Sequence, residues 1–179
     1  MSADNEVLYE IFSDPYAPTA EDIIAIGGKL DADILSFSYA RGIFPWPHEG
    51  YPLLWFAPEE RGVIDFVDLH VPRSLKKWIR QNENVYQITH NTRFKEVVRQ
   101  CRIQKRKGQN GTWINDEIEK AYAELFQKGH AFSCEVLRGE KLVGGVYGVR
   151  STNYYSCESM FHLEDNTSKL ALIKLAEKL

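Results

Sequence analysis

The chain has 179 residues, of which 44% are hydrophobic and 26% are charged, and its formal net charge is −3. This length fits one or two small domains, and this composition is typical of a folded globular protein, which argues against wholesale disorder. No stretch approaches the roughly 20 consecutive apolar residues of a membrane-spanning helix, and the polar opening MSADNEVLYE lacks the regions of a signal peptide. We therefore expect a cytoplasmic protein without a membrane partner.

The cysteines and histidines predict neither a disulfide framework nor a metal site. Cys101, Cys134 and Cys157 are odd in number and have no CxxC spacing, while the five histidines are scattered singly along the chain. We expect free thiols and no bound metal.

The first sixty or so residues are rich in aromatic residues, proline and glycine, which predicts short elements and loops. The segment IIAIGGKL (23–30) predicts a strand that enters a Gly-Gly turn, and DADILSFSYARG (31–42) predicts a short helix closed by Gly42. Between residues 43 and 64, four prolines interrupt backbone hydrogen bonding, so we expect a shaped loop region without a regular ladder.

A more regular pattern begins at Pro72, which suits the first turn of a helix over RSLKKWIR (73–80). Its apolar residues fall on one face, and its basic residues share the opposite face. The basic residues are Arg73, Lys76, Lys77 and Arg80. Although the net charge is negative, this helix and a second basic tract at 99–107 concentrate positive charge locally.

The segment VYQITH (85–90) predicts a strand, and a helix opened by Thr92 follows, with apolar residues at i, i+3, i+4 and i+7 from Phe94. Asn115 predicts the N-cap of a further helix that ends before Gly129. Its expected buried residues are Ile118, Ala121, Tyr122 and Leu125.

The last third of the chain predicts a sheet and a helix. Three strand-like runs at 130–138, 141–149 and 152–161, joined by short turns, predict an antiparallel meander. A helix from about Thr167 is expected to run on to Leu179. Its expected inward residues are Leu170, Ile173 and Leu172 or Ala176.

Glu158 is the best single chemical clue, because a carboxylate among aromatic, thiol and thioether neighbours is costly to desolvate unless it has a task or a partner. An outward-facing glutamate on a half-exposed strand is the alternative. Trp46 lies between two prolines, where a large ring is more often presented than packed, and such a ring suits stacking on nucleobases. Trp55 and Trp113, taken alone, are more simply interpreted as core residues. The basic face of 73–80 can equally be an ordinary solvated helix surface.

Two glycine-containing segments do not suggest a nucleotidase. Gly27-Gly28-Lys29 lacks the upstream glycine and the Ser/Thr of a phosphate-binding loop, and residues 107–111 lack its G-K-[ST] ending.

Several motifs occur together in a fixed order. They are AIGGKL, SYARGIFPWP, LLWFAPEERGVI, VPRSLKK, GTWI, AYAELFQKGHAFSCEV, KLVGGVYGV, CESMF and SKLAL. Together they resemble the leucyl/phenylalanyl-tRNA-protein transferase family from about residue 20 onward. The resemblance implies an α+β chain with a small N-terminal domain at 1–62 and, at 63–179, a mixed-sheet domain of the acetyltransferase (GNAT) type.

The resemblance also implies an activity. Such an enzyme moves leucine or phenylalanine from aminoacyl-tRNA to the N-terminal α-amine of an acceptor protein, with N-terminal Lys or Arg preferred, and so marks the acceptor for N-degron-dependent degradation. We expect that it needs no cofactor, because an aminoacyl ester is already activated. We also expect a monomer.

The family's site residues carry over to matching positions. Tyr39 and Trp46 match the site of the terminal adenosine of the tRNA, with the Trp ring stacking, and Trp113 and Tyr155 match aromatic positions around the aminoacyl pocket. Glu158 matches the site carboxylate. The basic residues Arg73, Lys76, Lys77 and Arg80 match the helix that tracks the acceptor-stem backbone.

This chain departs from the family pattern at three places. Tyr155 stands where Phe is usual, and Cys157 stands where Gly is usual. Family members continue past the SKLAL helix with a segment that bears an Asp-x-Gln motif, so we expect this chain to be truncated at its C-terminal end.

A strand from 152 to 161 places Tyr155 and Glu158 on opposite faces, because they are three residues apart. We therefore expect a β-bulge at Ser156 to Cys157 if both residues serve one site.

Two other functions stay open. An acyl-CoA-dependent N-acyltransferase of the same broad fold would need a pyrophosphate loop of the form [QR]-x-x-G-x-[GA], for which Gly108 and Gly111 have the wrong spacing. A non-catalytic module that binds the tRNA acceptor end would fit the missing Asp-x-Gln segment.

Overall fold

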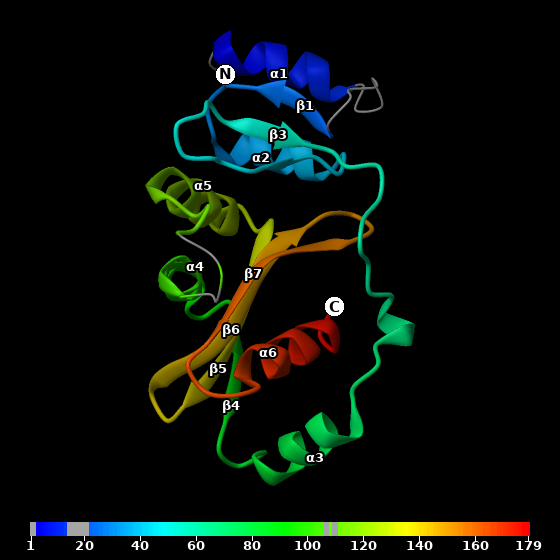
Figure 1. Ribbon diagram of the computed structural model, residues 1–179, viewed down its shortest axis with the longest axis vertical. Helices are drawn as coiled ribbons and strands as arrows, with labels where there is room; N and C mark the ends of the chain where they lie inside the picture. The colour runs from blue at the N-terminus through cyan, green and yellow to red at the C-terminus, as the bar shows by residue number, and fades with distance from the viewer. Residues whose placement is uncertain (1–2, 14–21, 106–107, 109–110) are drawn as a thin grey trace. The chain divides into compact units, whose positions relative to one another are not determined.

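A computed structural model describes residues 3–13, 22–105, 108 and 111–179 (Figure 1). These residues form an α+β arrangement with one sheet of three strands and one of four. They cluster into two compact units, the first drawn from Met1–Arg61, Lys105–Ala131 and Val149–Ser156, the second from Gly62–Gln104, Phe132–Gly148 and Cys157–Leu179. The division into domains at 1–62 and 63–179 stays a prediction. Within the described ranges, no helix has the length and apolar character needed to cross a membrane.

The sheet of the first unit consists of β1 (Ile23–Ile26), β3 (Leu54–Phe56) and β2 (Phe44–Pro45), in that antiparallel order. The expectation that the proline-rich stretch forms no ladder is wrong for these short strands. Pro45 lies on β2, an edge strand of this sheet, where a residue without an N–H can be accommodated. Directly after it, the Trp46 N–H donates to the carbonyl oxygen of Leu54 at 2.9 Å.

The predicted strand and Gly-Gly turn are confirmed, since β1 leads into Gly27 and Gly28 with φ angles of +90° and +83°. A Cβ atom on Gly28 would lie 2.3 Å from the Leu8 side chain, so the turn also needs glycine for close packing. Leu8 belongs to helix α1 (Ala3–Ser13), which the polar opening of the sequence did not predict. Its buried Leu8 and Phe12 anchor it, and the Phe12 ring lies 5.0 Å from that of Trp55.

Helix α2 (Ala32–Tyr39) begins at Asp31, whose carboxylate accepts hydrogen bonds from the N–H groups of Asp33 and Ile34. It ends earlier than the sequence suggested. Its C-cap is Ala40, so Gly42, with a φ of +77°, completes the following turn and is not the cap.

Helix α5 (Asp116–Gln127) agrees with the prediction. The Asn115 side chain accepts a hydrogen bond from the Ile118 N–H at 2.9 Å, and Gly129 follows the C-cap with a φ of +81°. The buried residues are those expected: Ile118, Ala121, Tyr122 and Leu125. The Lys128 ammonium, just after this helix, pairs with Asp33 at 2.5 Å.

The second sheet has the order β4-β5-β6-β7 (Figure 1). Its strands are β4 (Gln87–His90), β5 (Ala131–Arg138), β6 (Lys141–Arg150) and β7 (Tyr155–His162). β4 runs antiparallel to β5, and β5, β6 and β7 follow one another as neighbours across short turns, as the predicted meander requires. The accompanying helices are η1 (Phe66–Asp68), α3 (Arg73–Gln81), α4 (Phe94–Ile103) and α6 (Thr167–Ala176).

Helix α4 buries the predicted apolar stripe, but Thr92 is not its cap. The N-cap is Arg93, which makes no side-chain capping bond, and the Thr92 hydroxyl instead donates to Glu135 at 3.0 Å. A hydrogen bond to a carboxylate is stronger than one between neutral groups, so Glu135 orients the Thr92 side chain toward β5. The buried residues are Phe94, Val97, Val98 and Cys101.

Helix α6 begins at Thr167 as predicted but ends at Ala176, with Glu177 as C-cap, so the expectation that it runs to Leu179 is wrong. Leu170 and Ile173 are buried as expected, but the other buried apolar residues are Ala171 and Leu175 and not Leu172 or Ala176. The Thr167 hydroxyl donates to the Val143 carbonyl at 2.9 Å and so ties the helix to β6. A Cβ on Gly144 would lie 2.5 Å from that hydroxyl oxygen, which explains one glycine of the KLVGGVYGV motif.

Candidate functional site

An aromatic row lies on the sheet of the first unit and consists of Phe44, Trp46, His48 and Phe56. Phe44 lies on β2, and Trp46 and His48 follow it at every second position; the Phe44 and Trp46 ring centroids lie 6.5 Å apart. Phe56 lies opposite Phe44 on β3, with the two rings stacked at 6.0 Å.

Trp46 is presented to solvent by this row, as the flanking prolines predicted. Its side chain is 44% exposed, and its ring centroid lies 5.5 Å from that of His48 and 5.6 Å from that of Phe56. Trp55, by contrast, is fully buried, and its indole N–H donates to the Gly27 carbonyl at 3.1 Å. The structure therefore separates the two tryptophans into a core residue and a candidate stacking residue.

A second aromatic group of the first unit contains Tyr39, Tyr122 and Trp113. The hydroxyl oxygens of Tyr39 and Tyr122 lie 2.5 Å apart, and the rings meet edge to face at 6.3 Å. Tyr122 also contacts Trp113 edge to face at 6.4 Å. Tyr122, which the sequence identified only as a core residue, thus joins two of the predicted site residues.

Tyr39 is only 2% exposed, so little of its ring is open to a ligand. The Tyr154 hydroxyl donates a hydrogen bond to the backbone carbonyl of Tyr39. Tyr155, the predicted pocket residue beside it, is half-buried at the start of β7. Tyr154 was not predicted from the sequence, in which two successive tyrosines cannot be told apart.

Glu158 lies within β7 and is half-buried. The strand is continuous from Tyr155 to His162, and alternate burial is regular at Ser159 and Phe161. The bulge at Ser156 to Cys157 stays a prediction.

Cys157, next to Glu158, has a side chain that reaches solvent. The surrounding protein atoms and, secondly, the Glu158 carboxylate nevertheless both raise the pKa of its thiol. A thiol that keeps its proton at neutral pH is a poor nucleophile, which argues against covalent catalysis by this cysteine.

Helix α3 exposes all four predicted basic residues, Arg73, Lys76, Lys77 and Arg80. Its apolar residues are half-buried, and the Trp78 ring stacks on Tyr86 at 5.5 Å. Among the residues described, none of the four cations lies within ion-pair distance of a carboxylate. Such cations can approach phosphates without first breaking an internal contact.

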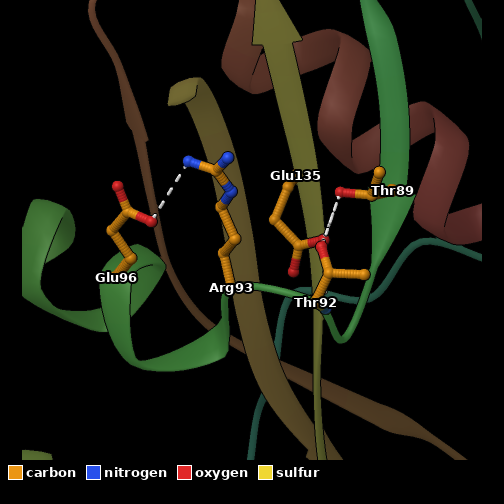
Figure 2. Close-up of polar contacts among 5 residues, drawn as sticks. All are labelled: Thr89, Thr92, Arg93, Glu96 and Glu135. Carbon is orange, nitrogen blue, oxygen red and sulfur yellow. Dashed lines mark hydrogen bonds and ion pairs between the residues drawn. The ribbon is translucent and has the colours of Figure 1, made fainter. Parts of the chain in front are cut away.

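The most deeply buried carboxylate was not singled out from the sequence. Glu135 on β5 is fully buried and accepts hydrogen bonds from three hydroxyl groups, as Figure 2 shows in part. The donors are Ser133 at 2.5 Å, Thr89 at 2.7 Å and Thr92 at 3.0 Å. Glu135 lies within the largely apolar strand sequence AFSCEVL (131–137), and this position could have indicated a buried carboxylate. These bonds tie the start of α4, where Arg93 pairs with Glu96 at 3.4 Å, to the sheet (Figure 2).

Metal ligation has no obvious place in the described ranges, where no three His, Cys, Asp or Glu side chains gather as potential ligands. The groups that do gather are hydroxyls, carboxylates and aromatic rings. They suit hydrogen bonding, proton transfer and stacking.

Comparison with known proteins accounts for both parts of the chain. Residues 63–179 match the family described as "Leucyl/phenylalanyl-tRNA protein transferase", and residues 28–59 match the description "Leucyl/phenylalanyl-tRNA protein transferase N-terminal domain". The N-terminal match contains the aromatic row, and the other match contains helix α3 and Glu158.

Curated relatives agree with these matches. Proteins named leucyl/phenylalanyl-tRNA–protein transferase from Flavobacterium johnsoniae and Flavobacterium psychrophilum are 44% and 42% identical to this chain. The alignments cover 94% and 90% of this chain and 81% and 75% of the relatives. The protein of that name from Myxococcus xanthus is 40% identical, over 94% of this chain and 71% of its own length. The chain therefore belongs to the leucyl/phenylalanyl-tRNA–protein transferase family.

Proposed function

We propose that this protein transfers leucine or phenylalanine from aminoacyl-tRNA to the N-terminal α-amine of acceptor proteins. The observation that carries the proposal is the exposed Trp46 ring within the aromatic row of the matched N-terminal domain. Exposed aromatic rings that lie side by side often mark a binding site, and unpaired nucleobases stack well on such rings.

The reaction needs positioning and one proton transfer. The acceptor amine attacks the ester carbonyl carbon, an amide C–N bond forms, and the ester C–O bond breaks. The amine loses a proton, and the departing ribose oxygen gains one, so no cofactor is consumed. We assign Glu158 the task of holding or accepting the amine proton, because a half-buried carboxylate on a strand is well placed to act as a general base.

Aromatic residues of the first unit, from the row and from the second group, are assigned to the aminoacyl-adenosine end. Trp46 would stack on the terminal adenine, and Trp113 and Tyr155, both half-buried, would line the pocket for the leucine or phenylalanine side chain. Tyr39 would act by support, because its buried hydroxyl pairs with Tyr122, which contacts Trp113.

Helix α3 is assigned to the tRNA backbone. Its four exposed cations would contact phosphates, which gives affinity without reading the base sequence. The resemblance of residues 63–179 to a GNAT-type domain belongs to the same proposal. It is supported by a meander of consecutive strands flanked by helices.

Transfer of labelled leucine or phenylalanine from charged tRNA to short peptides tests the proposal. Peptides that differ only in their first residue would separate acceptors with N-terminal Lys or Arg, which we expect to be modified, from those with Asp or Gly. Acetyl-CoA replaces charged tRNA in a parallel reaction. Label transfer only from acetyl-CoA would overturn the proposal, and tRNA binding without transfer would reduce the protein to a binding module.

A further inference from the structure

The aromatic row extends beyond Trp46. His48 is exposed and lies two residues further along the chain. Its imidazole centroid is 5.5 Å from the Trp46 ring, at an interplanar angle of 38°, and 6.3 Å from the Phe56 ring. The imidazole therefore offers a second ring face beside the one assigned to the terminal adenine.

The local backbone fixes the relation between these two rings. Pro47 stands between them and restricts its own φ angle, while the preceding Trp46 N–H is bound to the Leu54 carbonyl at 2.9 Å. Phe56 on β3 contacts both rings from across the sheet. A pair of rings held in this way loses little conformational entropy when a ligand stacks on it.

The chemistry of the row favours a nucleic-acid occupant over an aliphatic one. All four side chains of the row are planar rings, and successive bases of a single strand stack on successive aromatic side chains. The Arg61 guanidinium lies at the Phe44 end of the row, 4.8 Å from the Phe44 ring centroid, and carries a positive charge. It also donates a hydrogen bond to the Gly42 carbonyl. This charge complements the phosphate of a strand that follows the row.

We propose that His48 forms a second stacking position, which binds the nucleotide that precedes the terminal adenosine of the tRNA. The inference rests on the proposed function, in which Trp46 binds that adenosine. It adds that the protein binds at least two unpaired nucleotides of the acceptor end, and that His48 contributes only to the second.

Two ligands that differ by one nucleotide test this inference. The first is a phenylalanyl-adenosine analogue with an amide in place of the ester, and the second carries a cytidylate on its 5′ side. We expect His48→Ala to weaken binding of the dinucleotide about three- to tenfold, below the full range for base stacking because imidazole is a small ring, and to leave the mononucleoside within about twofold. His48→Tyr should retain dinucleotide affinity because it keeps a ring.

Matched variants distinguish the possible outcomes. Trp46→Ala should weaken both ligands, and His70→Ala, which removes an exposed histidine outside the row, should weaken neither. No change with His48→Ala, or an equal loss for both ligands, would overturn the second position while leaving Trp46 and the proposed function in place. A fall in self-association caused by His48→Ala, without a change in dinucleotide binding, would assign the row to a second copy of the chain. If the unaltered protein binds neither ligand, the proposed function fails as well.

Discussion

The hydroxyl oxygens of Tyr39 and Tyr122 lie 2.5 Å apart although the residues are 83 positions apart in the sequence. One hydroxyl donates to the other in a buried site, and this bond connects helices α2 and α5. A phenylalanine at either position leaves the other hydroxyl without this partner.

We expect Tyr39→Phe and Tyr122→Phe each to lower the free energy of unfolding by about 1 to 2 kcal/mol, because each removes a buried hydrogen bond. The double variant should lose less than the sum of the two, since both substitutions remove the same hydrogen bond. Urea denaturation measures all three, with Tyr51→Phe, a 70% exposed tyrosine, as the control. Strict additivity would show that the two hydroxyls do not interact in solution.

Glu158→Gln should lower the rate of aminoacyl transfer at least about tenfold and leave tRNA affinity nearly unchanged, because the carboxylate is proposed to act on the amine and not on phosphates. Single-turnover transfer and a separate tRNA-binding measurement check the two parts. Glu140→Gln, at an exposed position in the turn after β5, is the matched control. Unchanged transfer would return Glu158 to an ordinary half-exposed strand residue.

Replacing Lys76 and Lys77 with Glu should weaken Leu-tRNA and Phe-tRNA to similar extents. Each phosphate contact that is lost should also reduce the slope of log affinity against log salt concentration by about one. The control replaces Lys169 and Lys178, two exposed lysines of the C-terminal segment, in the same way. A loss confined to one of the two tRNAs would contradict a contact to the backbone.

Much of the secondary structure could be predicted because local signals decide it. Asn115 caps α5, and the apolar spacing of α4 is the spacing that the structure buries. The errors arise where tertiary contacts decide. Helix α1 depends on the packing of Leu8 and Phe12, and Thr92 is drawn away from the helix N-terminus by Glu135, which lies 43 positions further along the chain.

The candidate site was predictable in part for the same reason. The two prolines beside Trp46 indicate its exposure locally, and the helical spacing of basic and apolar residues in 73–80 indicates the basic face of α3. Tyr122 and His48 could not be singled out, because their relation to Tyr39 and Trp46 depends on ring geometry and not on spacing alone.

Gly144→Ala should destabilise the second unit by about 1 to 3 kcal/mol, the usual cost of overpacking. The new methyl group would lie 2.5 Å from the Thr167 hydroxyl oxygen and 2.9 Å from the backbone carbonyl carbon of the same residue, which cannot move without shifting α6. Gly62→Ala is the control, because a Cβ there meets nothing within 4 Å. Equal stability of the two variants would mean that α6 does not pack on β6 in solution as described.

The last prediction concerns pH and the contacts of Glu164, which follows β7, with Tyr86, which precedes β4, and with Arg138 of β5. The Tyr86 hydroxyl donates to its carboxylate at 2.8 Å, and Arg138 lies 3.3 Å from it. The pKa of Glu164 is lowered, first by the Tyr86 hydrogen bond and further by Arg138. A carboxyl group whose pKa is lower in the folded state stabilises the fold above its unfolded pKa of about 4.3, and this contribution disappears as the pH falls through the folded pKa.

We therefore expect Tyr86→Phe to reduce the free energy of unfolding at neutral pH. The effect should become progressively smaller as the pH falls through the folded pKa of Glu164, below which the carboxyl group is protonated in both states. Denaturant unfolding of the two proteins at several pH values measures the difference. Tyr51→Phe, which removes an exposed hydroxyl, should show no such trend. A difference that stays constant down to the acid limit would show that Tyr86 acts through packing on Trp78, at a ring distance of 5.5 Å, and not through the charge of Glu164.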